Sequence, residues 1–102
     1  MNMGLRRKID FLKIKKSFPI LRAINHKLRQ RILKLLEEQS NVSVSEISRQ
    51  LNFDRSVTSH HLAILRRSNV VQTQRKGKEI YYSLCPQRFI YIRDFIDSLL
   101  AK

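Results

Sequence analysis

Apolar residues recur at helical spacing through the first half of the chain. In residues 5–16 these apolar residues alternate with basic ones, which predicts a first helix. Phe18 and Pro19 then predict the end of that helix. Asn25 is a good N-cap for a second helix over residues 25–38. The apolar stripe of this second helix consists of Leu28, Ile32, Leu35 and Leu36. The spacing therefore predicts two helices, each with one face turned to a core.

Two further helices, joined by a tight turn, are predicted next. Ser43, with Glu46 three residues later, forms a capping box that predicts a short helix over residues 44–51. Residues 52–53 form the turn, and Asp54 caps the following helix. Two helices separated by so short a turn are typical of a helix-turn-helix.

The residue pattern changes after the fourth helix, which ends at about Ser68. Residues 70–75 and 79–84 are rich in Val, Thr, Ile and Tyr, and Gly77 lies between them. This pattern predicts two strands joined by a tight turn. Pro86 suits the first turn of a last helix, whose apolar residues cover well over half of its circumference.

The predicted order is four helices, a hairpin and a helix. We therefore expect a mainly α fold with a small β-hairpin wing, the winged helix-turn-helix, in a single domain over residues 1–102. The helix-turn-helix spans residues 43–68 and the wing spans residues 70–84. The terminal helices, within 1–18 and 86–102, would expose large apolar faces in a monomer, so we expect them to form a dimer interface. The alternative is a monomer whose terminal helices cover each other.

Charge indicates the class of partner. The chain has 21 Lys and Arg against 8 Asp and Glu, a formal net charge of +13. Residues 1–36 hold eleven of these basic residues and a single acid, Asp10. So large a basic excess makes polyanions the leading partners.

Membrane and secretory signals are weak by comparison. No apolar run approaches the roughly 18 residues of a membrane span, and the basic N-terminus is not followed by an apolar signal core. We therefore expect a soluble cytoplasmic protein with no membrane partner. A basic amphipathic N-terminal helix that touches anionic lipid is the alternative.

The helix over residues 54–68 has two different faces. The inner face carries Thr58, Leu62 and Leu65, expected to pack on Leu35 and Leu51. The outer face carries Arg55, Ser56, Ser59 and His60. Short hydroxyls let the backbone approach DNA, while Arg55 can fork to guanine or phosphate and His60 can donate to phosphate or a base edge. Arg66 is a further candidate DNA contact; the alternative is a polar face that is merely solvated.

Basic residues also surround the predicted hairpin turn. Arg75, Lys76 and Lys78 flank Gly77. Beside a helix in the major groove, such a tip can contact phosphates or enter the minor groove. The affinity that it adds should be mostly independent of sequence and should fall steeply with salt. The alternative is a hairpin whose charges prevent edge-to-edge aggregation.

The chain offers little for catalysis or metal binding. Its single cysteine, Cys85, cannot form an internal disulfide or a zinc cluster. His60 and His61 are adjacent on a helix and point about 100° apart, which disfavours a shared metal ion, the alternative role for these histidines. Nothing supplies a nucleophile with both a base and an orienting acid. We therefore expect no enzyme, no catalytic residues, no metal and no cofactor.

Two segments resemble the ArsR/SmtB family of winged-helix repressors. AINHKLRQRILKLL, residues 23–36, resembles the second-helix motif of that family. LNFDRSVTSHHLAILRRSNVVQTQRKGKEIYYSL, residues 51–84, resembles its recognition helix and wing, and the match covers roughly residues 20–84. The resemblance implies a homodimer that binds an operator and represses transcription. It also implies base or phosphate contacts for Arg55, Ser56, Ser59 and His60.

Many members of that family sense metals, but their ligands are missing at the matching positions. One site uses Cys-x-Cys at the start of the third helix, where this chain has Ser43 and Ser45, and a hydroxyl is a poor ligand for soft metals. The other needs histidines on the last helix, which has Asp94 and Asp97 but no histidine. Cys85 is then expected to be a small buried hydrophobe, with redox sensing or an intersubunit disulfide as alternatives.

The predicted function is sequence-specific repression by a homodimer on a palindromic double-stranded DNA operator. The helix over residues 54–68 would lie in the major groove and the 75–78 tip on the backbone or in the minor groove. Two-fold symmetry would match half-sites about 34 Å apart, one helical turn. The alternative is an architectural or RNA-binding basic protein without sequence preference, which would bind one genomic site and random duplex equally.

Overall fold

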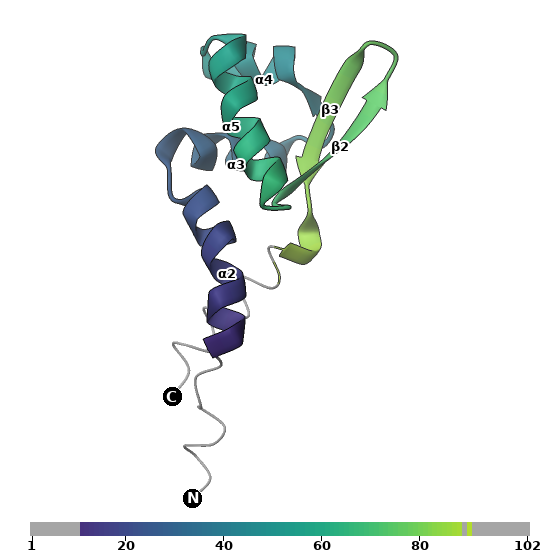
Figure 1. Ribbon diagram of the computed structural model, residues 1–102. Helices are drawn as coiled ribbons and strands as arrows, with labels where there is room; N and C mark the ends of the chain where they lie inside the picture. Colours follow the sequence, from purple (N-terminus) through teal and green to yellow (C-terminus); the bar gives the residue numbers. More distant parts are fainter. Residues whose placement is uncertain (1–10, 89, 91–102) are drawn as a thin grey trace, which may run out of the picture.

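The computed structural model describes residues 11–88 and 90 (Figure 1). In chain order its elements are α2 (Phe11–Ile24), α3 (Lys27–Glu38), β1 (Val42–Ser43), α4 (Val44–Leu51), α5 (Arg55–Arg67), β2 (Val71–Lys76) and β3 (Glu79–Leu84). The three strands form an antiparallel sheet in the order β1-β3-β2. The expected winged helix-turn-helix, mainly α with a small β wing, is confirmed.

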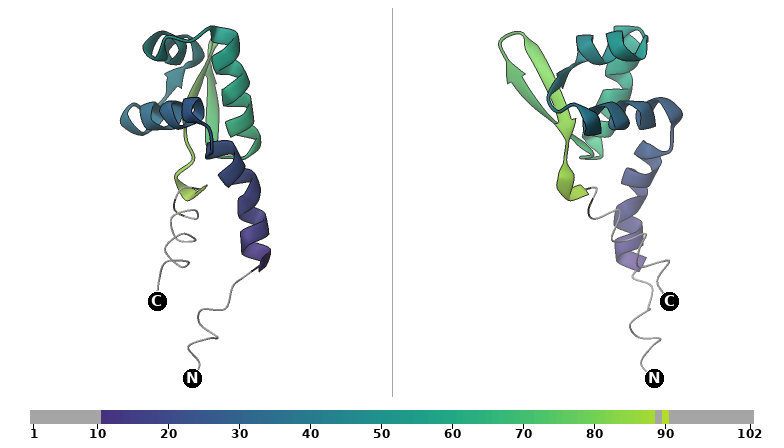
Figure 2. Two further views of the ribbon diagram at one scale, coloured as in Figure 1. Left: turned by 90° about the vertical axis from the view of Figure 1, so that its left-hand side faces the viewer. Right: turned by 180° about the vertical axis from the view of Figure 1, so that it is seen from behind.

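The core lies where α3, α4 and α5 meet the base of the sheet. Figure 2 shows α3 and α4 on the same side of α5 in its left view, and the hairpin to one side of the helices in its right view. The large side chains with almost no exposed surface are Ile32, Ile47, Leu62, Leu65, Val70 and Thr58. The predicted inner face of α5 is therefore confirmed, because Thr58, Leu62 and Leu65 are all buried while the outer face is exposed.

The predicted helix end at Phe18 and Pro19 is wrong. Helix α2 continues through Pro19 to Ile24. A proline inside a helix removes one backbone hydrogen bond and costs about 3 kcal/mol relative to alanine. Ile20 and Ala23, which follow Pro19, are buried in the core, and their burial offsets that local cost.

The start of α3 is also displaced from the prediction. His26, rather than Asn25, is its N-cap, and the Nδ1 atom of His26 accepts a hydrogen bond from the Leu28 N–H at 3.1 Å. An imidazole can take this role because its unprotonated nitrogen is an acceptor. Asn25 is exposed just before the cap.

The turn between α4 and α5 follows the sequence prediction closely. Ser43 Oγ accepts from the Glu46 N–H at 3.2 Å, and α4 spans the predicted residues. The second hydrogen bond of the predicted capping box does not form, because the Glu46 carboxylate accepts from Arg49 and Gln50 instead. Asn52 adopts the left-handed conformation, with φ of 60°, that reverses the chain. Asp54 precedes α5 as predicted, but its carboxylate makes no capping hydrogen bond. The first-turn N–H groups of α5 are therefore not occupied by this side chain.

The wing is a regular hairpin attached to the helix-turn-helix by a strand that the sequence did not predict. Strands β2 and β3 pair from Val71↔Leu84 to Lys76↔Glu79, and Gly77 has φ of 64°, as in a type II′ turn. Strand β1 pairs with β3 at Val42↔Tyr82. Because Ser43 is both the end of β1 and the cap of α4, the wing base and the start of α4 share one backbone segment.

The predicted terminal helices lie mostly outside the described residues. Residues 1–10, 89 and 91–102 belong to them, so the predicted dimer helices within 1–18 and 86–102 are described only in part. Pro86 stands in a helical turn, as predicted. Cys85 was expected to be buried but is half-buried. It directly follows β3, and its N–H donates to the Val70 carbonyl.

Candidate nucleic-acid interface

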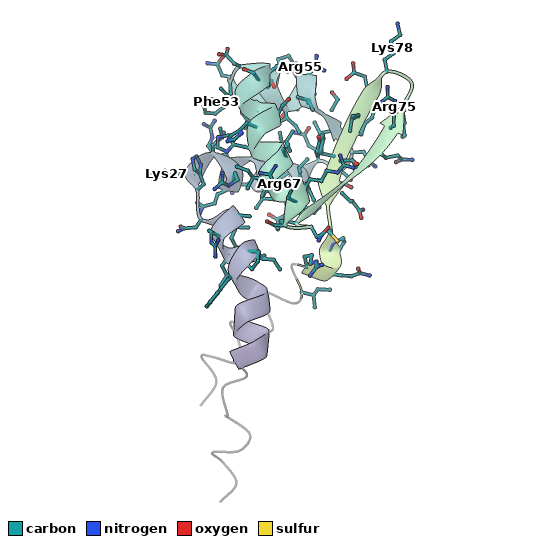
Figure 3. All side chains as sticks on the ribbon, viewed as in Figure 1. Lys27, Phe53, Arg55, Arg67, Arg75 and Lys78 are labelled. Carbon is teal, nitrogen blue, oxygen red and sulfur yellow. The ribbon has the colours of Figure 1, made fainter. Side chains whose placement is uncertain are left out.

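The exposed face of α5 carries a line of residues that we call the outward stripe: Ser56, His60, Ala63 and Arg67. Their spacing of four, three and four residues keeps them on one side of a helix, opposite the buried Leu62 and Leu65. Ser56, His60 and Arg67 are exposed, and Ala63 is half-buried. Figure 3 shows Arg55 at one end of α5 and Arg67 at the other. A hydroxyl, an imidazole and a guanidinium are thus presented along this stripe.

Arg67 is absent from the residues predicted from the sequence, although its helical spacing from His60 was a sufficient signal. The residues that were predicted all have exposed side chains: Arg55, Ser56, Ser59, His60 and Arg66 on α5, and Arg75, Lys76 and Lys78 on the wing. Helical geometry places Arg55, Ser59 and Arg66 along one border of the outward stripe. The helix and the hairpin tip are therefore free to touch a ligand.

The tip of the wing is positively charged and lies at the same end of the molecule as the start of α5. Figure 3 shows Lys78 and Arg55 at the end opposite α2. Lys76 Nζ lies 5.6 Å from the centroid of the Tyr81 ring, a cation–π contact that orients this ammonium on its own hairpin. Among the described side chains, none of the three basic wing residues forms an ion pair. Their charges are available to an external anion.

A histidine and arginine cluster connects α5 to the junction between α2 and α3. His61 Nδ1 lies 3.1 Å from Arg29 Nη1, and Arg29 Nε donates to the carbonyl of Ala23 at the end of α2. The rings of His26 and His61 have centroids 4.6 Å apart. Because arginine only donates, Nδ1 of His61 must be the acceptor, and its ring is neutral in this contact. Arg29 is thus a positioning residue for α5.

Burial lowers the pKa of His61, and the nearby His26, Arg29 and His60 lower it further. The unfolded chain binds this proton more readily than the folded chain does. Stability from neutral His61 is thus fully present above its ordinary value of 6.5 and is lost as pH falls through the lowered pKa.

His61→Gln, which keeps an acceptor for Arg29 but does not titrate, tests this linkage. Between about pH 7.5 and about pH 5.5 the variant should lose less free energy of unfolding than the unmodified protein. One pKa unit is worth about 1.4 kcal/mol, and partial hydration of His61 should keep the difference below that. Urea denaturation at the two pH values measures it. His60→Gln, on the exposed side, should keep most of the pH dependence, because burial, His26 and Arg29 still act on His61. Equal slopes for His61→Gln and the unmodified protein would contradict the assignment.

The described residues contain no group of three His, Cys, Asp or Glu side chains able to hold a metal ion. The two neighbouring histidines each have one nitrogen already engaged, His26 with the Leu28 N–H and His61 with Arg29.

Within the same residues, no helix is long and apolar enough to cross a bilayer.

An apolar groove lies at the other end of the molecule, beside α2. It has a volume of about 1140 Å³. Its apolar lining consists of Phe18, Leu21, Ile24, Leu33, Leu84, Pro86 and Ile90, and the polar residues Arg22, Asn25, Gln30, Lys34 and Glu37 also line it. Phe18 is 48% exposed and Ile90 is 49% exposed, which is unusual for side chains of this size. The groove therefore presents an exposed, mostly hydrophobic surface well away from the wing tip.

Comparison with known proteins gives consistent matches. The profile of the family described as "Bacterial regulatory protein, arsR family" matches residues 26–73. The transcriptional repressor SdpR of Bacillus subtilis is 37% identical over 65 residues, which cover 64% of this chain and 71% of that protein. The structure of the transcriptional regulator HlyU from Vibrio vulnificus is 30% identical, with a TM-score of 0.69 over 89% of this chain and 94% of that one.

A more distant structure shares the fold alone. It is the homodimeric winged helix-turn-helix DNA-binding domain of Mb0332 from Mycobacterium bovis, described as a possible ArsR-family regulator. It is 20% identical, with a TM-score of 0.70 over 81% of this chain and 78% of that one.

Proposed function

Because the chain belongs to the arsR family of bacterial regulatory proteins, and is therefore a transcriptional regulator rather than an enzyme, we propose that it represses transcription as a homodimer bound to a palindromic operator. The observation that carries this proposal is the outward stripe of α5. Its exposed Ser56, His60 and Arg67 form a polar, cationic strip on a helix whose other face is anchored in the core. A helix of this width fits the major groove of B-DNA.

The roles within the interface follow from side-chain chemistry. Arg55 and Arg67 can each fork to guanine or hold a phosphate, and His60 can donate to a base edge or a phosphate. Ser56 and Ser59 keep the helix close to the DNA because their side chains are short. The first-turn N–H groups of α5, which Asp54 does not cap, can donate to a phosphate at the positive end of the helix.

The wing and Arg66 complete the proposed contacts. Arg75, Lys76 and Lys78 would hold the backbone or enter the minor groove beside the half-site. Their charges supply affinity, and the outward stripe supplies sequence preference. Arg66 borders the stripe and would reach a flanking phosphate.

The apolar groove supports the homodimer. Phe18 and Ile90 are exposed at the α2 end, and a second copy placed there would cover them while leaving both wings free. The Mb0332 domain, which shares this fold, is described as homodimeric. A two-fold axis through this end would present two α5 helices to one face of the duplex, with half-sites about 34 Å apart.

Selection of bound genomic fragments, followed by affinity measurement at fixed salt, tests the proposal. We expect a palindromic site bound at least about 10³-fold more tightly than random duplex. Equal affinity for the selected site and for random duplex would contradict it, and would favour an architectural protein instead.

A matched pair of serine variants locates the interface. Ser59→Asp places a carboxylate beside DNA phosphates and should lower operator affinity at least about 10²-fold. Ser40→Asp makes the same change at an exposed serine between α3 and β1, and should have little effect. Similar losses in both variants would place the interface elsewhere.

A further inference from the structure

Resting on the proposed function, we propose that Val57 reads the methyl group of a thymine in each operator half-site. Val57 is 38% exposed and is one of three large hydrophobic side chains exposed among the described residues. The other two, Phe18 and Ile90, line the apolar groove at the far end of the molecule. Val57 is therefore the only large hydrophobic side chain exposed on α5, the helix that we propose faces DNA.

The position of Val57 gives it no evident structural task. It is the third residue of α5, where a glutamate or glutamine would complete a capping box. Valine is a weaker helix former than either of these residues, because its branched side chain loses rotational freedom in a helix. A partly exposed valine recovers only part of that cost through burial. Burial of the valine methyl groups against a ligand would supply the apolar contact that the folded chain leaves incomplete.

The neighbours of Val57 place it at the edge of the outward stripe. His60 lies three residues further along the helix and His61 four, so all three side chains adjoin on the helix surface. His61 is held by Arg29, which limits how far this part of α5 can shift. The methyl groups of Val57 are therefore presented beside a polar donor, at a fixed place in the first turn.

Chemistry narrows the partner to one feature of the major groove. Each base pair there offers hydrogen-bond donors and acceptors, and only thymine adds an apolar group, its C5 methyl. Valine has one dominant rotamer in a helix, so little side-chain entropy is lost on contact. Val57 carries no charge, and its contact contributes sequence preference without adding to the salt dependence of binding.

Replacement of each operator thymine in turn by deoxyuridine, which removes only the methyl group, tests the assignment. The unmodified protein should lose affinity roughly fourfold at one position in each half-site, the value of one buried methyl-sized group. In Val57→Ala the same replacement should cost clearly less, because the two γ-methyl groups of the valine are gone and only the β-carbon remains. Alanine favours helix, so this variant should fold, and circular dichroism checks that it does.

A second variant and a reference duplex separate the possible failures. His60→Ala should bind more weakly yet keep the fourfold methyl penalty, since it leaves Val57 in place. No penalty at any thymine, or an equal penalty in Val57→Ala, overturns the assignment of Val57. Preference for the natural operator over random duplex, measured in the same series, reports on the proposed function by itself: its loss in the unmodified protein would overturn both.

Discussion

Replacing Arg75, Lys76 and Lys78 together with glutamine is expected to lower affinity for any duplex on the order of 10²- to 10³-fold at 0.1 M salt. Each phosphate contact contributes about 0.9 to the slope of log affinity against log salt, so the slope should fall by about 2.7 per protomer. The ratio of operator to random-duplex affinity should hardly change, because we propose that the wing holds phosphates and that α5 reads bases. Titrations at several salt concentrations measure all three quantities.

The hairpin itself should survive this replacement. Gly77 keeps the turn, and the β2–β3 pairing is made by backbone groups. Lys27→Gln removes a positive charge from the start of α3, which Figure 3 shows on the side of α5 away from the wing, and should leave the slope almost unchanged. A slope equal to that of the unmodified protein in the triple variant would show that the wing does not touch phosphates.

Phe18→Asp is expected to convert the proposed dimer into a monomer and to lower operator affinity at least about 10²-fold. A carboxylate in place of Phe18 must lose hydration at a mostly apolar contact, and Arg22, one turn further along α2, can offset only part of a cost of several kcal/mol. The folded protomer should tolerate the change, because Phe18 is 48% exposed. Losing the second copy removes one of two half-site contacts, so the affinity loss follows directly.

Sedimentation equilibrium gives the mass, and a gel-shift titration gives the affinity. Phe18→Leu keeps an apolar side chain of similar reach and should remain dimeric. Thermal unfolding should show that both variants are folded. A dimeric mass for Phe18→Asp at micromolar concentration would contradict the assignment of this groove to the second copy.

Local patterns carried most of the fold prediction, because the deciding interactions span only a few residues. The stripe from Leu28 to Leu36 is buried as its spacing requires, and the Ser43 cap forms its predicted bond. Gly77 has the positive φ that a tight hairpin turn needs. The candidate residues on α5 have exposed side chains for the same reason, because helical periodicity settles which face is outside. Those of the wing are exposed because they flank the hairpin turn, where neither face of the sheet is covered.

The predictions that failed depend on energies that local patterns do not contain. Pro19 is an unfavourable helix residue, and only the buried contacts of Ile20 and Ala23 explain why α2 continues. Strand β1 has two residues, too few to show an alternating pattern. The Arg29–His61 contact joins residues far apart in the chain, so no local motif could predict it. Arg67 is different, because its helical spacing from His60 would have been enough to predict it as an exposed residue of the outward stripe.

The pairing of β1 with β3 has a consequence for how such a protein could be switched. The hairpin base and the first residues of α4 share one strand, and α4 packs on α5, so wing and recognition helix are coupled as one unit. The distance between them is thereby set by backbone hydrogen bonds between β1 and β3 and by the buried side chains that pack α4 on α5. In the proposed homodimer, a signal that releases DNA would then have to change the angle between two rigid protomers, instead of deforming the wing or α5 within either one.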